Sequence, residues 1–387
     1  MVNKWWVRPR SGLDRRSLAG AGAQLPMPLV GHTAALDFDR GSWRPQRLGS
    51  LGRASSPRNF SSTSGHGLIN TAAAIARLTG LSPNANGDPI SSGAVGTTDW
   101  NLSAIGSPQS WAQGFRGQGQ VVAVIDTGVD LTHPDLRGNL WRNRNEIAGN
   151  GIDDDGNGFV DDRQGWDFVR NRARPQDRSG HGTHVAGIIA AKDNGIGSTG
   201  VAPRAKIMPI RVLGRNGTNG ATLARGIRYA VHNGADVINL SLGSIPGTGV
   251  SPVVKRSLRL ARRSGVSMAI AAGNERLSFG ATRAGEPAFW AATHRLGIAV
   301  GAVDRDNDMA DFSNPTGNRR FNWFVVAPGV DIASTFRGGR TALLSGTSMA
   351  TPHVAGAIAL LRSADPRATP GQIARSLIGT ASPIVGA

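Results

Sequence analysis

The feature that most constrains this chain is a regular alternation, from about residue 99 onward, of short apolar runs with amphipathic segments. The apolar runs are rich in Val, Ile and Ala, as are strands that are buried on both faces of a parallel sheet. We expect strands at residues 120–126, 206–213, 236–242, 266–271, 297–303 and 322–327. Helices are expected at residues 182–192, 222–232, 252–263, 348–363 and 370–379. The alternation predicts an α/β fold of three layers with a mostly parallel central sheet.

The first part of the chain has a different character. Residues 1–62 are rich in Arg, Gly, Ser and Pro and show no sustained period, so we expect a poorly ordered extension there. Apolar residues spaced by three and four in GHGLINTAAAIARLTGL predict a short helix near residues 68–80. We therefore divide the chain into an N-terminal extension or linker, residues 1–98, and one folded domain, residues 99–387.

Composition excludes several classes of protein. The chain has no Cys, which removes disulfides, Cys-ligated zinc, iron–sulfur clusters and a Cys nucleophile. It has no run of 18 apolar residues, so we expect no membrane span, and residues 1–16 lack the apolar core of a signal peptide. The net charge of +17 raises the question of a polyanion partner. Because no aromatic-flanked basic stripe accompanies that charge, we expect arginine-rich solvated faces and no nucleic-acid binding.

Three polar residues occupy positions where α/β proteins place their chemistry. Asp126 ends the apolar run VVAVID, His181 opens a helix in SGHGTHVAGIIA, and Ser348 begins a long apolar helix in SGTSMATPHVAG. Each residue taken alone is typical of a helix cap or a turn. Together they indicate nucleophilic catalysis, because a serine hydroxyl needs a base to take its proton and an acidic residue to orient that base.

With these motifs, the chain resembles the subtilisin-like serine proteases, or subtilases, in which the order is Asp, His, Ser. The resemblance rests on VIDTGVD, HGTHVAG and GTSMATPHVAG and covers residues 100–381. It implies a subtilisin-like fold and a serine endopeptidase that cleaves proteins through an acyl-enzyme. Ser348 would be the nucleophile, His181 the general base and then acid, and Asp126 the residue that orients His181.

The resemblance also assigns supporting residues. Asn274, in AAGNE, matches the subtilase oxyanion-hole Asn, with the backbone N–H of Ser348 as the second donor. The segment Ser241-Leu242-Gly243 and the loop at residues 214–220, which contains Gly217, look like substrate-binding edges against which an extended peptide lies as an added strand. For Glu275 two interpretations stay open, an exposed solvated side chain, which we favour, and a group that selects basic substrate side chains. His184 and His353 are expected to be structural.

An acidic segment, GNGIDDDGNGFVDD, has the pattern of a site for a hard cation. Its oxygen-bearing side chains alternate around turn-forming glycines, as Ca²⁺ requires. The candidate ligands are Asp153, Asp155, Asn157, Asp161 and Asp162. The segment resembles the first half of an EF-hand loop, but Gln164 stands at the twelfth position, so other ligands would be needed. We predict a structural calcium site, with a solvated acidic turn as the alternative.

Two further questions remain open at this point. The main alternative to an active endopeptidase is a catalytically silent binding or scaffold protein on the same fold. The resemblance favours a secreted protein, although no signal peptide is visible, and we expect a monomer whose partners are protein or peptide substrates. We also hypothesise that the helix within GHGLINTAAAIARL packs beside residues 370–379, where relatives carry a C-terminal helix; a degenerate propeptide remnant is the rival interpretation.

Overall fold

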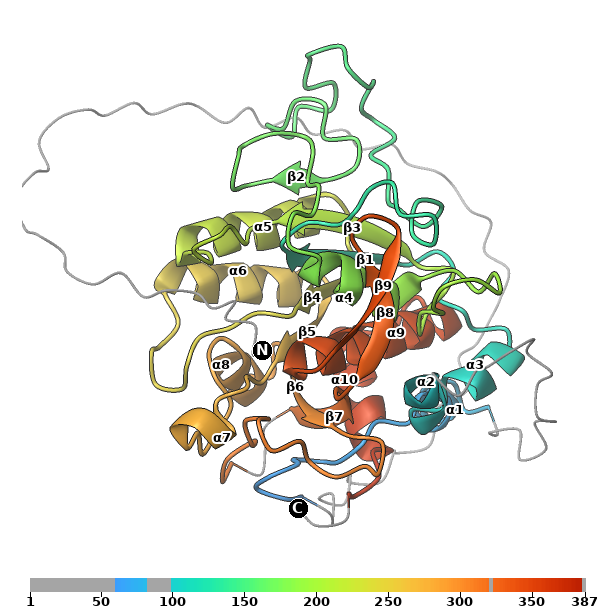
Figure 1. The fold of residues 1–387 in the computed structure, drawn as a ribbon, viewed down its shortest axis with the longest axis vertical. Coiled ribbons are helices and arrows are strands. Elements are labelled where there is room, and N and C mark those ends of the chain that lie inside the picture. The colour runs from blue at the N-terminus through green and yellow to red at the C-terminus, as the bar shows by residue number, and fades with distance from the viewer. Residues whose placement is uncertain (1–59, 82–98, 320–322, 385–387) are drawn as a thin grey trace, which may run out of the picture. The chain divides into compact units, whose positions relative to one another are not determined.

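The computed structural model describes residues 60–81, 99–319 and 323–384, all of which belong to one compact unit. Their centre is a seven-stranded sheet in the order β2-β3-β1-β4-β5-β6-β7 (Figure 1). Every neighbouring pair in this sheet is parallel. The strands are β1 (Val121–Asp126), β2 (Trp166–Asp167), β3 (Lys206–Arg211), β4 (Val237–Leu240), β5 (Ser267–Ala271), β6 (Ile298–Val303) and β7 (Phe324–Pro328). The parallel α/β fold is thus confirmed.

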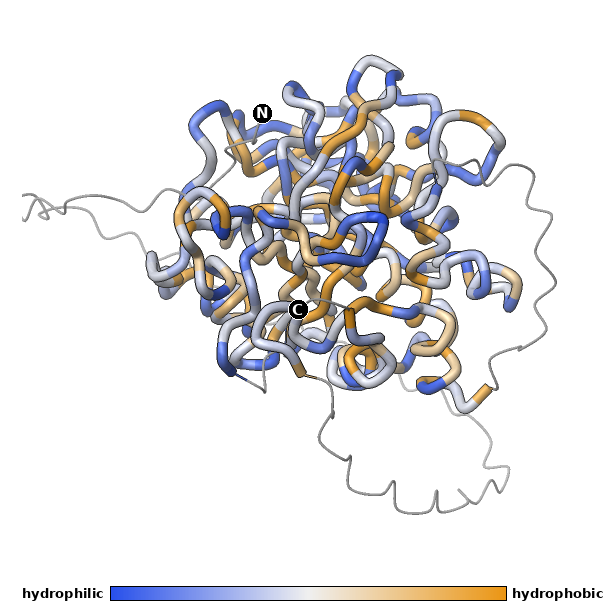
Figure 2. The backbone as a smooth tube through the Cα atoms, turned by 60° about the horizontal axis from the view of Figure 1, so that its bottom comes forward, coloured by the Kyte–Doolittle hydropathy of each residue, from blue (hydrophilic) through white to orange (hydrophobic). Residues whose placement is uncertain are grey.

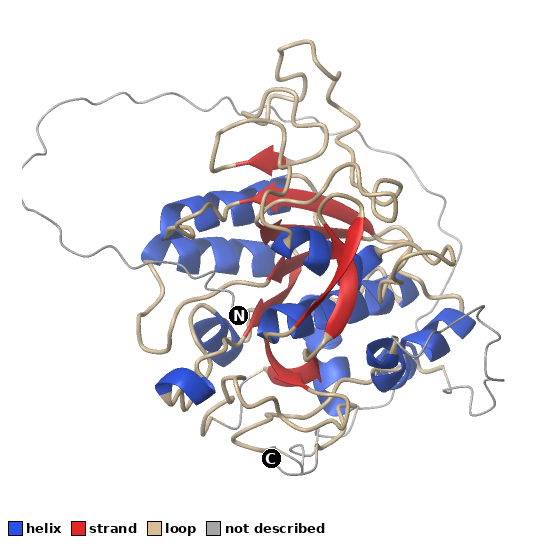
Figure 3. Ribbon diagram, in the orientation of Figure 1, coloured by secondary structure: helices blue, strands red, loops and turns tan. Residues whose placement is uncertain are grey.

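Helices cover both faces of the sheet, as Figure 3 shows. On one face α5 (Gly220–His232) packs against α6 (Pro252–Arg263), with α8 (Ala288–Thr293) beside β6. On the other face α4 (His181–Ala190) packs against α9 (Thr347–Ala364), which contacts β1 and the strands from β4 to β7. The remaining helices of the described chain are α1 (Thr71–Thr79), α2 (Trp100–Ala104), α3 (Ser107–Ala112), α7 (Arg276–Phe279) and α10 (Pro370–Gly379).

The apolar core lies between these layers (Figure 2). Central strands such as β5 and β6 are buried along their whole length, which is why their sequences are continuously apolar. All ten residues of α4 are buried, and α9 is exposed at few of its positions. Two helices with so little exposed surface are fixed by packing on every side, so the residues at their amino ends are held in place.

The expected short helix is present as α1, where the side chain of Asn70 caps the first turn by accepting the N–H of Ala73 at 2.9 Å. Just before this helix, Leu68 joins the edge of the sheet by forming a parallel bridge with Val326 of β7. Leu68 also exchanges two backbone hydrogen bonds of 2.8 Å with Ser382. Helix α1 packs against α9 and α10. Residues 60–81 therefore lie against the sheet-bearing body, including residues 60–62 of the extension expected over residues 1–62. Its residues 1–59 and the stretch 82–98 fall outside the described residues.

The expected strands and helices all appear, with ends that agree or differ by at most three residues. The sequence analysis missed the short elements α2, α3, α7, α8 and β2, which are too brief to establish a period. It also missed the antiparallel hairpin of β8 (Ile332–Phe336) and β9 (Arg340–Leu344). No helix within the described ranges combines the length and the apolar character that a membrane crossing demands.

Candidate active site

The polar residues singled out from the sequence meet at one edge of the sheet. Asp126 is the last residue of β1, Ser241 follows β4, and Asn274 comes three residues after β5. Because β1, β4 and β5 are parallel and lie next to one another in the order β1-β4-β5, their carboxyl ends open on the same edge. His181 and Ser348 reach that edge from the amino ends of α4 and α9.

Asp126 and His181 form a buried pair. The distance between His181 Nδ1 and Asp126 Oδ1 is 2.7 Å, and the two residues are 4% and 0% exposed. The carboxylate oxygen also accepts the backbone N–H of Thr127 at 2.7 Å, which fixes the plane of the carboxylate. An Nδ1–H that donates to the carboxylate leaves the lone pair on Nε2, the tautomer that a general base requires.

The electrostatic surroundings favour the charged form of His181. Burial opposes a charge on the imidazole, but the Asp126 carboxylate, its hydrogen bond and the charge of Asp177 outweigh that effect and raise the pKa of His181 above its usual 6.5. A site that stabilises an imidazolium also stabilises the state that forms when the base has taken a proton.

Asp177 was not identified from the sequence, yet it anchors the loop that leads into α4. Its Oδ1 accepts the hydroxyl of Thr127 and the backbone N–H groups of Ser179 and Gly180. Its Oδ2 accepts both the N–H and the hydroxyl of Thr183. A carboxylate with five donors at a helix amino end fixes where that helix starts. The sequence signal for this role is an acidic residue shortly before a helix, a position typical of groups that bind the free N–H groups of the first turn.

Gly182 allows α4 to approach β1 closely. A Cβ at this position would lie 2.1 Å from the carbonyl oxygen of Gly128 and 3.1 Å from Asp126 Oδ1. Only a residue without a side chain permits this approach, and without it the imidazole of His181 would not reach the Asp126 carboxylate.

The nucleophile candidate is tied to Ser241 by two reciprocal hydrogen bonds. Pro352 lies inside α9 and has no N–H, so the carbonyl of Ser348, four residues earlier, has no helical donor. The hydroxyl of Ser241 fills this role at 2.8 Å. In turn the Ser348 hydroxyl donates to the carbonyl of Ser241 at 3.2 Å, and no hydrogen bond between Ser348 and His181 occurs in the described chain. Catalytic hydrogen bonds often form only when substrate is bound.

Two hydrogen-bond donors converge beside Ser348. The Oδ1 of Asn274 accepts the N–H and the hydroxyl of Thr347, both at 2.9 Å, which leaves the amide Nδ2 as the donor of this side chain. A Cβ built on Gly346 would lie 3.4 Å from Asn274 Nδ2 and 3.7 Å from the Ser348 nitrogen. Because Gly346 has no side chain, the space between these two donors is open, and an oxyanion can occupy it.

Glu275 differs from the interpretation that the sequence favoured. The side chain is only 3% exposed, so the expectation of a solvated Glu is wrong. Its Oε2 accepts Asn314 Nδ2 at 2.7 Å, and its N–H donates to Asn314 Oδ1 at 2.8 Å. Burial raises the pKa of this carboxyl group above its usual value. This paired contact holds the turn that carries Asn274.

The predicted substrate-binding segments follow two different strands of the sheet, β4 and β3. The side chain of Leu242 is buried in the core, but no hydrogen bond within the described residues uses the backbone of Leu242 or Gly243. Gly217 closes a tight turn after β3 through two backbone hydrogen bonds with Gly214. The assignment of these two segments as substrate-binding edges stays a prediction.

Two further buried histidines, His184 and His353, contact backbone carbonyls and other polar groups of the core. His184 Nε2 lies 3.0 Å from the carbonyl oxygens of both Ile332 and Ala342. His353 lies 2.8 Å from Asn101 Nδ2 through Nε2 and 2.8 Å from the carbonyl of Met349 through Nδ1. Burial lowers the pKa of each to about 4, so both are neutral at pH 7.

The acidic segment folds differently from an EF-hand. Carboxylate oxygens of Glu146, Asp155 and Asp162 lie within 4.8 Å of one another. Glu146, which the sequence analysis did not select, is 3% exposed, and its Oε2 is buried without a partner in the described chain. Asp153 and Asp161 instead accept backbone N–H groups of their own loop.

Asn157 lies beside this cluster and donates to it. Its Nδ2 is 3.2 Å from Asp155 Oδ2 and 3.1 Å from Asp162 Oδ2, while its Oδ1 accepts the N–H of Phe159. Of the five predicted ligands, the structure thus gathers Asp155 and Asp162 with the unpredicted Glu146. The three carboxylates form an all-oxygen donor set of the kind that hard cations take.

Comparisons with known proteins agree with this geometry. The sequence profile described as "Subtilase family" matches residues 117–386. Subtilisin E of Bacillus subtilis (strain 168) is 41% identical over 286 residues, which cover 73% of this chain and 66% of that protein. Subtilisin of Bacillus pumilus is 40% identical over the same share of this chain and 91% of its own length. The chain spans about two thirds or less of the length of several matched relatives, 66% for subtilisin E.

A solved structure gives the same result at the level of the fold. The crystal structure of a cold-adapted subtilisin-like serine proteinase superposes with a TM-score of 0.52 and 32% sequence identity. The superposition covers 67% of this chain and 81% of that one. From its sequence motifs, its sheet and its relatives, this chain belongs to the subtilase family.

Proposed function

We propose that this chain is a serine endopeptidase that hydrolyses peptide bonds of proteins through an acyl-enzyme. The observation that carries the proposal is the meeting of a buried Asp126–His181 pair, joined at 2.7 Å, with Ser348 at the amino end of α9. The family membership supports it, since the matched relatives are named subtilisins.

The first half of the reaction would use the atoms described above. The Ser348 hydroxyl leaves its hydrogen bond with the Ser241 carbonyl and turns toward His181 Nε2, which takes its proton as Oγ attacks the peptide carbonyl carbon. Asp126 holds the imidazole in the required tautomer and balances its new charge. The carbonyl oxygen, now negative, receives hydrogen bonds from Asn274 Nδ2 and the backbone N–H of Ser348.

The second half would return the enzyme to its starting state. His181 gives its proton to the leaving amine, and the substrate's acyl group stays on Ser348 as an ester. Water then enters, His181 takes a proton from it, and the resulting hydroxide attacks the ester carbonyl. Collapse of the second tetrahedral intermediate releases the acid and restores the Ser348 hydroxyl.

The test is hydrolysis of casein and of fluorogenic peptides by the full chain and by its Ser348→Ala variant. We expect loss of nearly all activity in the variant and labelling of the parent chain alone by a fluorophosphonate. A folded parent chain that neither cleaves nor becomes labelled would favour the silent-scaffold alternative.

We further propose that Glu146, Asp155 and Asp162 hold a structural Ca²⁺. Burial raises the pKa of Glu146 and of Asp162, so the fold places carboxylates where their charge is poorly solvated. A cation relieves this cost, and the unpartnered Glu146 Oε2 would be one of its ligands. Tyr229 donates to Asp162 Oδ2 at 2.5 Å and joins the cluster to α5.

Thermal unfolding tests this calcium site in a Ser348→Ala background, where self-digestion does not interfere. We expect Ca²⁺ to raise Tm and EDTA to reverse the increase, because a ligand bound only by the folded state stabilises it. Glu146→Gln should remove most of the calcium-dependent increase. The matched control Asp153→Asn, in the same loop but outside the cluster, should retain it. An equal loss in both variants would contradict the assigned ligands.

A further inference from the structure

A cavity lies at the end of the sheet opposite the candidate active site. It is lined by Gly119 and Val121 at the start of β1 and by Lys206 at the start of β3, whereas Asp126 ends β1. The length of β1 places the two sites about 17 Å apart along the strand. The cavity volume is about 1250 Å³, ample for a ligand with several charged groups.

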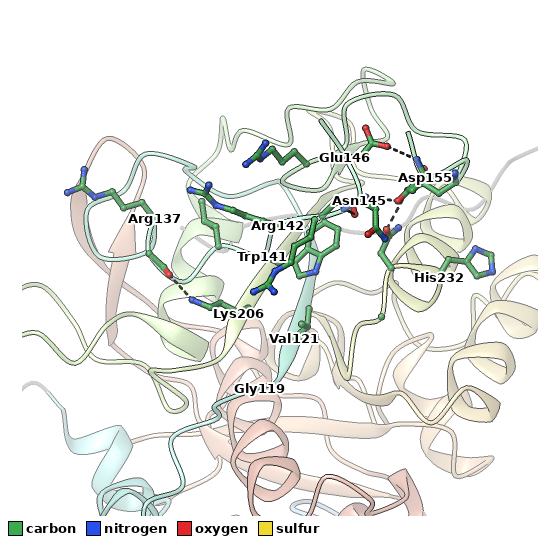
Figure 4. A pocket seen from close by; sticks show the side chains of 18 of the residues that line it. Gly119, Val121, Arg137, Trp141, Arg142, Asn145, Glu146, Asp155, Lys206 and His232 are labelled. Atoms are coloured by element: carbon green, nitrogen blue, oxygen red, sulfur yellow. Dashed lines mark hydrogen bonds between the residues drawn. The ribbon is translucent and has the colours of Figure 1, made fainter. Parts of the chain in front are cut away.

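Basic side chains dominate the lining of this cavity, which also includes Glu146 and Asp155 of the proposed calcium site (Figure 4). Six cationic side chains contribute to it: Arg137, Arg142, Arg144, Arg163, Arg204 and Lys206. Within the described chain, none of the six forms an ion pair with a carboxylate. The six cationic groups outnumber the two carboxylates of the lining, Glu146 and Asp155, so like charges repel one another there, and this repulsion is relieved when an anion binds.

The fold brings these side chains together from separate parts of the chain. The segment at Leu140 and Trp141 runs parallel to the start of β3, and the N–H of Trp141 donates to the carbonyl of Ile207 at 2.7 Å. The chain then leaves the sheet. A hydrogen bond of 2.9 Å from the N–H of Asn143 to the carbonyl of Arg163 closes the base of that excursion. The arginines at 142, 144 and 163 are thereby held beside Lys206.

Lys206 is the most constrained of the six. Its ammonium donates to the carbonyl of Gly138 at 2.8 Å, so it stays at the wall of the cavity. Burial and the neighbouring Lys192 and Arg142 lower its pKa from the usual value. The cationic side chains are thus close enough to act on one another.

We propose that this cavity binds a compact, multiply charged anion of the phosphate type, such as an oligophosphate. Guanidinium groups match the oxygens of phosphate with paired, charge-assisted hydrogen bonds. Among the described residues, Trp141 and His232 are the only ring side chains in its lining, too few to stack a run of bases.

Calorimetric titration with tripolyphosphate tests the proposal on the full chain carrying Ser348→Ala, so that the result does not depend on proteolysis. Ionic strength is held constant, and sulfate and EDTA serve as the comparison anions, EDTA because it reports any effect of calcium removal. The pocket variant is Arg142→Gln with Arg204→Gln. The matched control removes the same charge from exposed positions of α6, Arg256→Gln with Arg263→Gln.

We expect tripolyphosphate to bind more tightly than sulfate, with affinity at least about 10-fold weaker in the pocket variant and nearly unchanged in the control. Equal losses in both variants would overturn the proposal, because they would indicate general attraction to a basic surface. Binding no tighter than that of sulfate or EDTA would also overturn it. The proposal would also be overturned if a single-stranded oligonucleotide bound more tightly than tripolyphosphate and its affinity fell equally in both variants.

Discussion

At the residue scale, each candidate catalytic side chain has few hydrogen-bonding or charged partners, and these partners determine its chemical role. His181 has one charged partner within hydrogen-bond distance, Asp126, and a second carboxylate, Asp177, that acts through space. Asn274 has its oxygen occupied by Thr347, which leaves only the amide N–H groups for a substrate. Each side chain is thus restricted to one role before substrate arrives.

The raised pKa of His181 predicts the pH dependence of activity. The base must be neutral, so kcat/KM should rise as the pH increases through the His181 pKa, and the midpoint should lie above 6.5. Asp126→Asn should move the midpoint lower, because it removes a raising charge, and should lower kcat about 10⁴-fold. Steady-state kinetics from pH 4 to 10 provide the measurement. An unchanged midpoint in Asp126→Asn would refute the assignment.

His184 and His353 supply an internal control for this profile. Their pKa values of about 4 lie well below the expected midpoint. The activity change near neutral pH should therefore persist in His353→Gln, provided that the variant folds.

Gly346 offers a second test at the residue scale. The methyl group of Gly346→Ala would stand 3.4 Å from Asn274 Nδ2 and occupy the space of the oxyanion. We expect kcat to fall about 10²-fold with a small change in KM, since an oxyanion contact acts mainly in the transition state. Adding Asn274→Leu should cause little further loss. Independent, multiplicative losses in the double variant would show that the two positions do not act on one oxyanion.

At the scale of elements, α9 is adapted to its position beside β4. Pro352 interrupts its hydrogen-bond ladder at the residue that carries the nucleophile candidate, and Ser241, just after β4, supplies the missing donor. The hydroxyl of Ser241 also accepts a hydrogen bond of 3.0 Å from Asn239 Nδ2. Polar contacts therefore join strand β4 to helix α9 beside Ser348. The proline thereby connects the start of a helix to the end of a strand.

This arrangement predicts a rescue. Ser241→Ala leaves the Ser348 carbonyl without a donor and should lower the free energy of unfolding by about 1–3 kcal/mol. Pro352→Ala restores a backbone N–H at the position that can bond this carbonyl, so the double variant should regain part of the loss. Urea unfolding in the Ser348→Ala background measures both. Strictly additive losses would mean that Pro352 and Ser241 do not share this carbonyl.

At the scale of the whole molecule, the segment at residues 60–81 completes the fold. Helix α1 packs against α9 and α10, and Leu68 joins Val326 and Ser382, so three distant parts of the sequence meet there. This contact fits the hypothesis that the early helix lies beside residues 370–379. We propose that the folded domain begins near residue 60 and not at residue 99.

A core substitution in α1 tests that proposal. Ile75 is fully buried, so Ile75→Ala should lower the free energy of unfolding of the whole domain by about 2–5 kcal/mol. The control Leu81→Ala, at a side chain 53% exposed, should change it by less than about 0.5 kcal/mol. Fluorescence and circular dichroism should report one shared transition. A separate early transition confined to α1 would indicate an appended helix.

The sequence by itself determined the architecture and the four catalytic candidates. Continuous apolar runs require strands buried on both faces, and the order of the Asp126, His181 and Ser348 motifs carries the family resemblance. Such signals are local: they reside in spacing and residue type within a few turns or a single strand. The elements that the sequence analysis did not predict were either too short to show a period or, like the β8–β9 hairpin, short strands between longer elements.

Only the tertiary structure decided which side chains share a site across long separations. Glu146 joins Asp155 and Asp162, Glu275 is buried against Asn314, and Ser241 meets Ser348 more than one hundred residues later in the chain. None of these contacts can be read from the periodicity of the sequence, because each depends on where a turn directs a side chain once the sheet has assembled. Periodicity fixes which face of an element is buried, whereas the packing of elements fixes which polar groups meet.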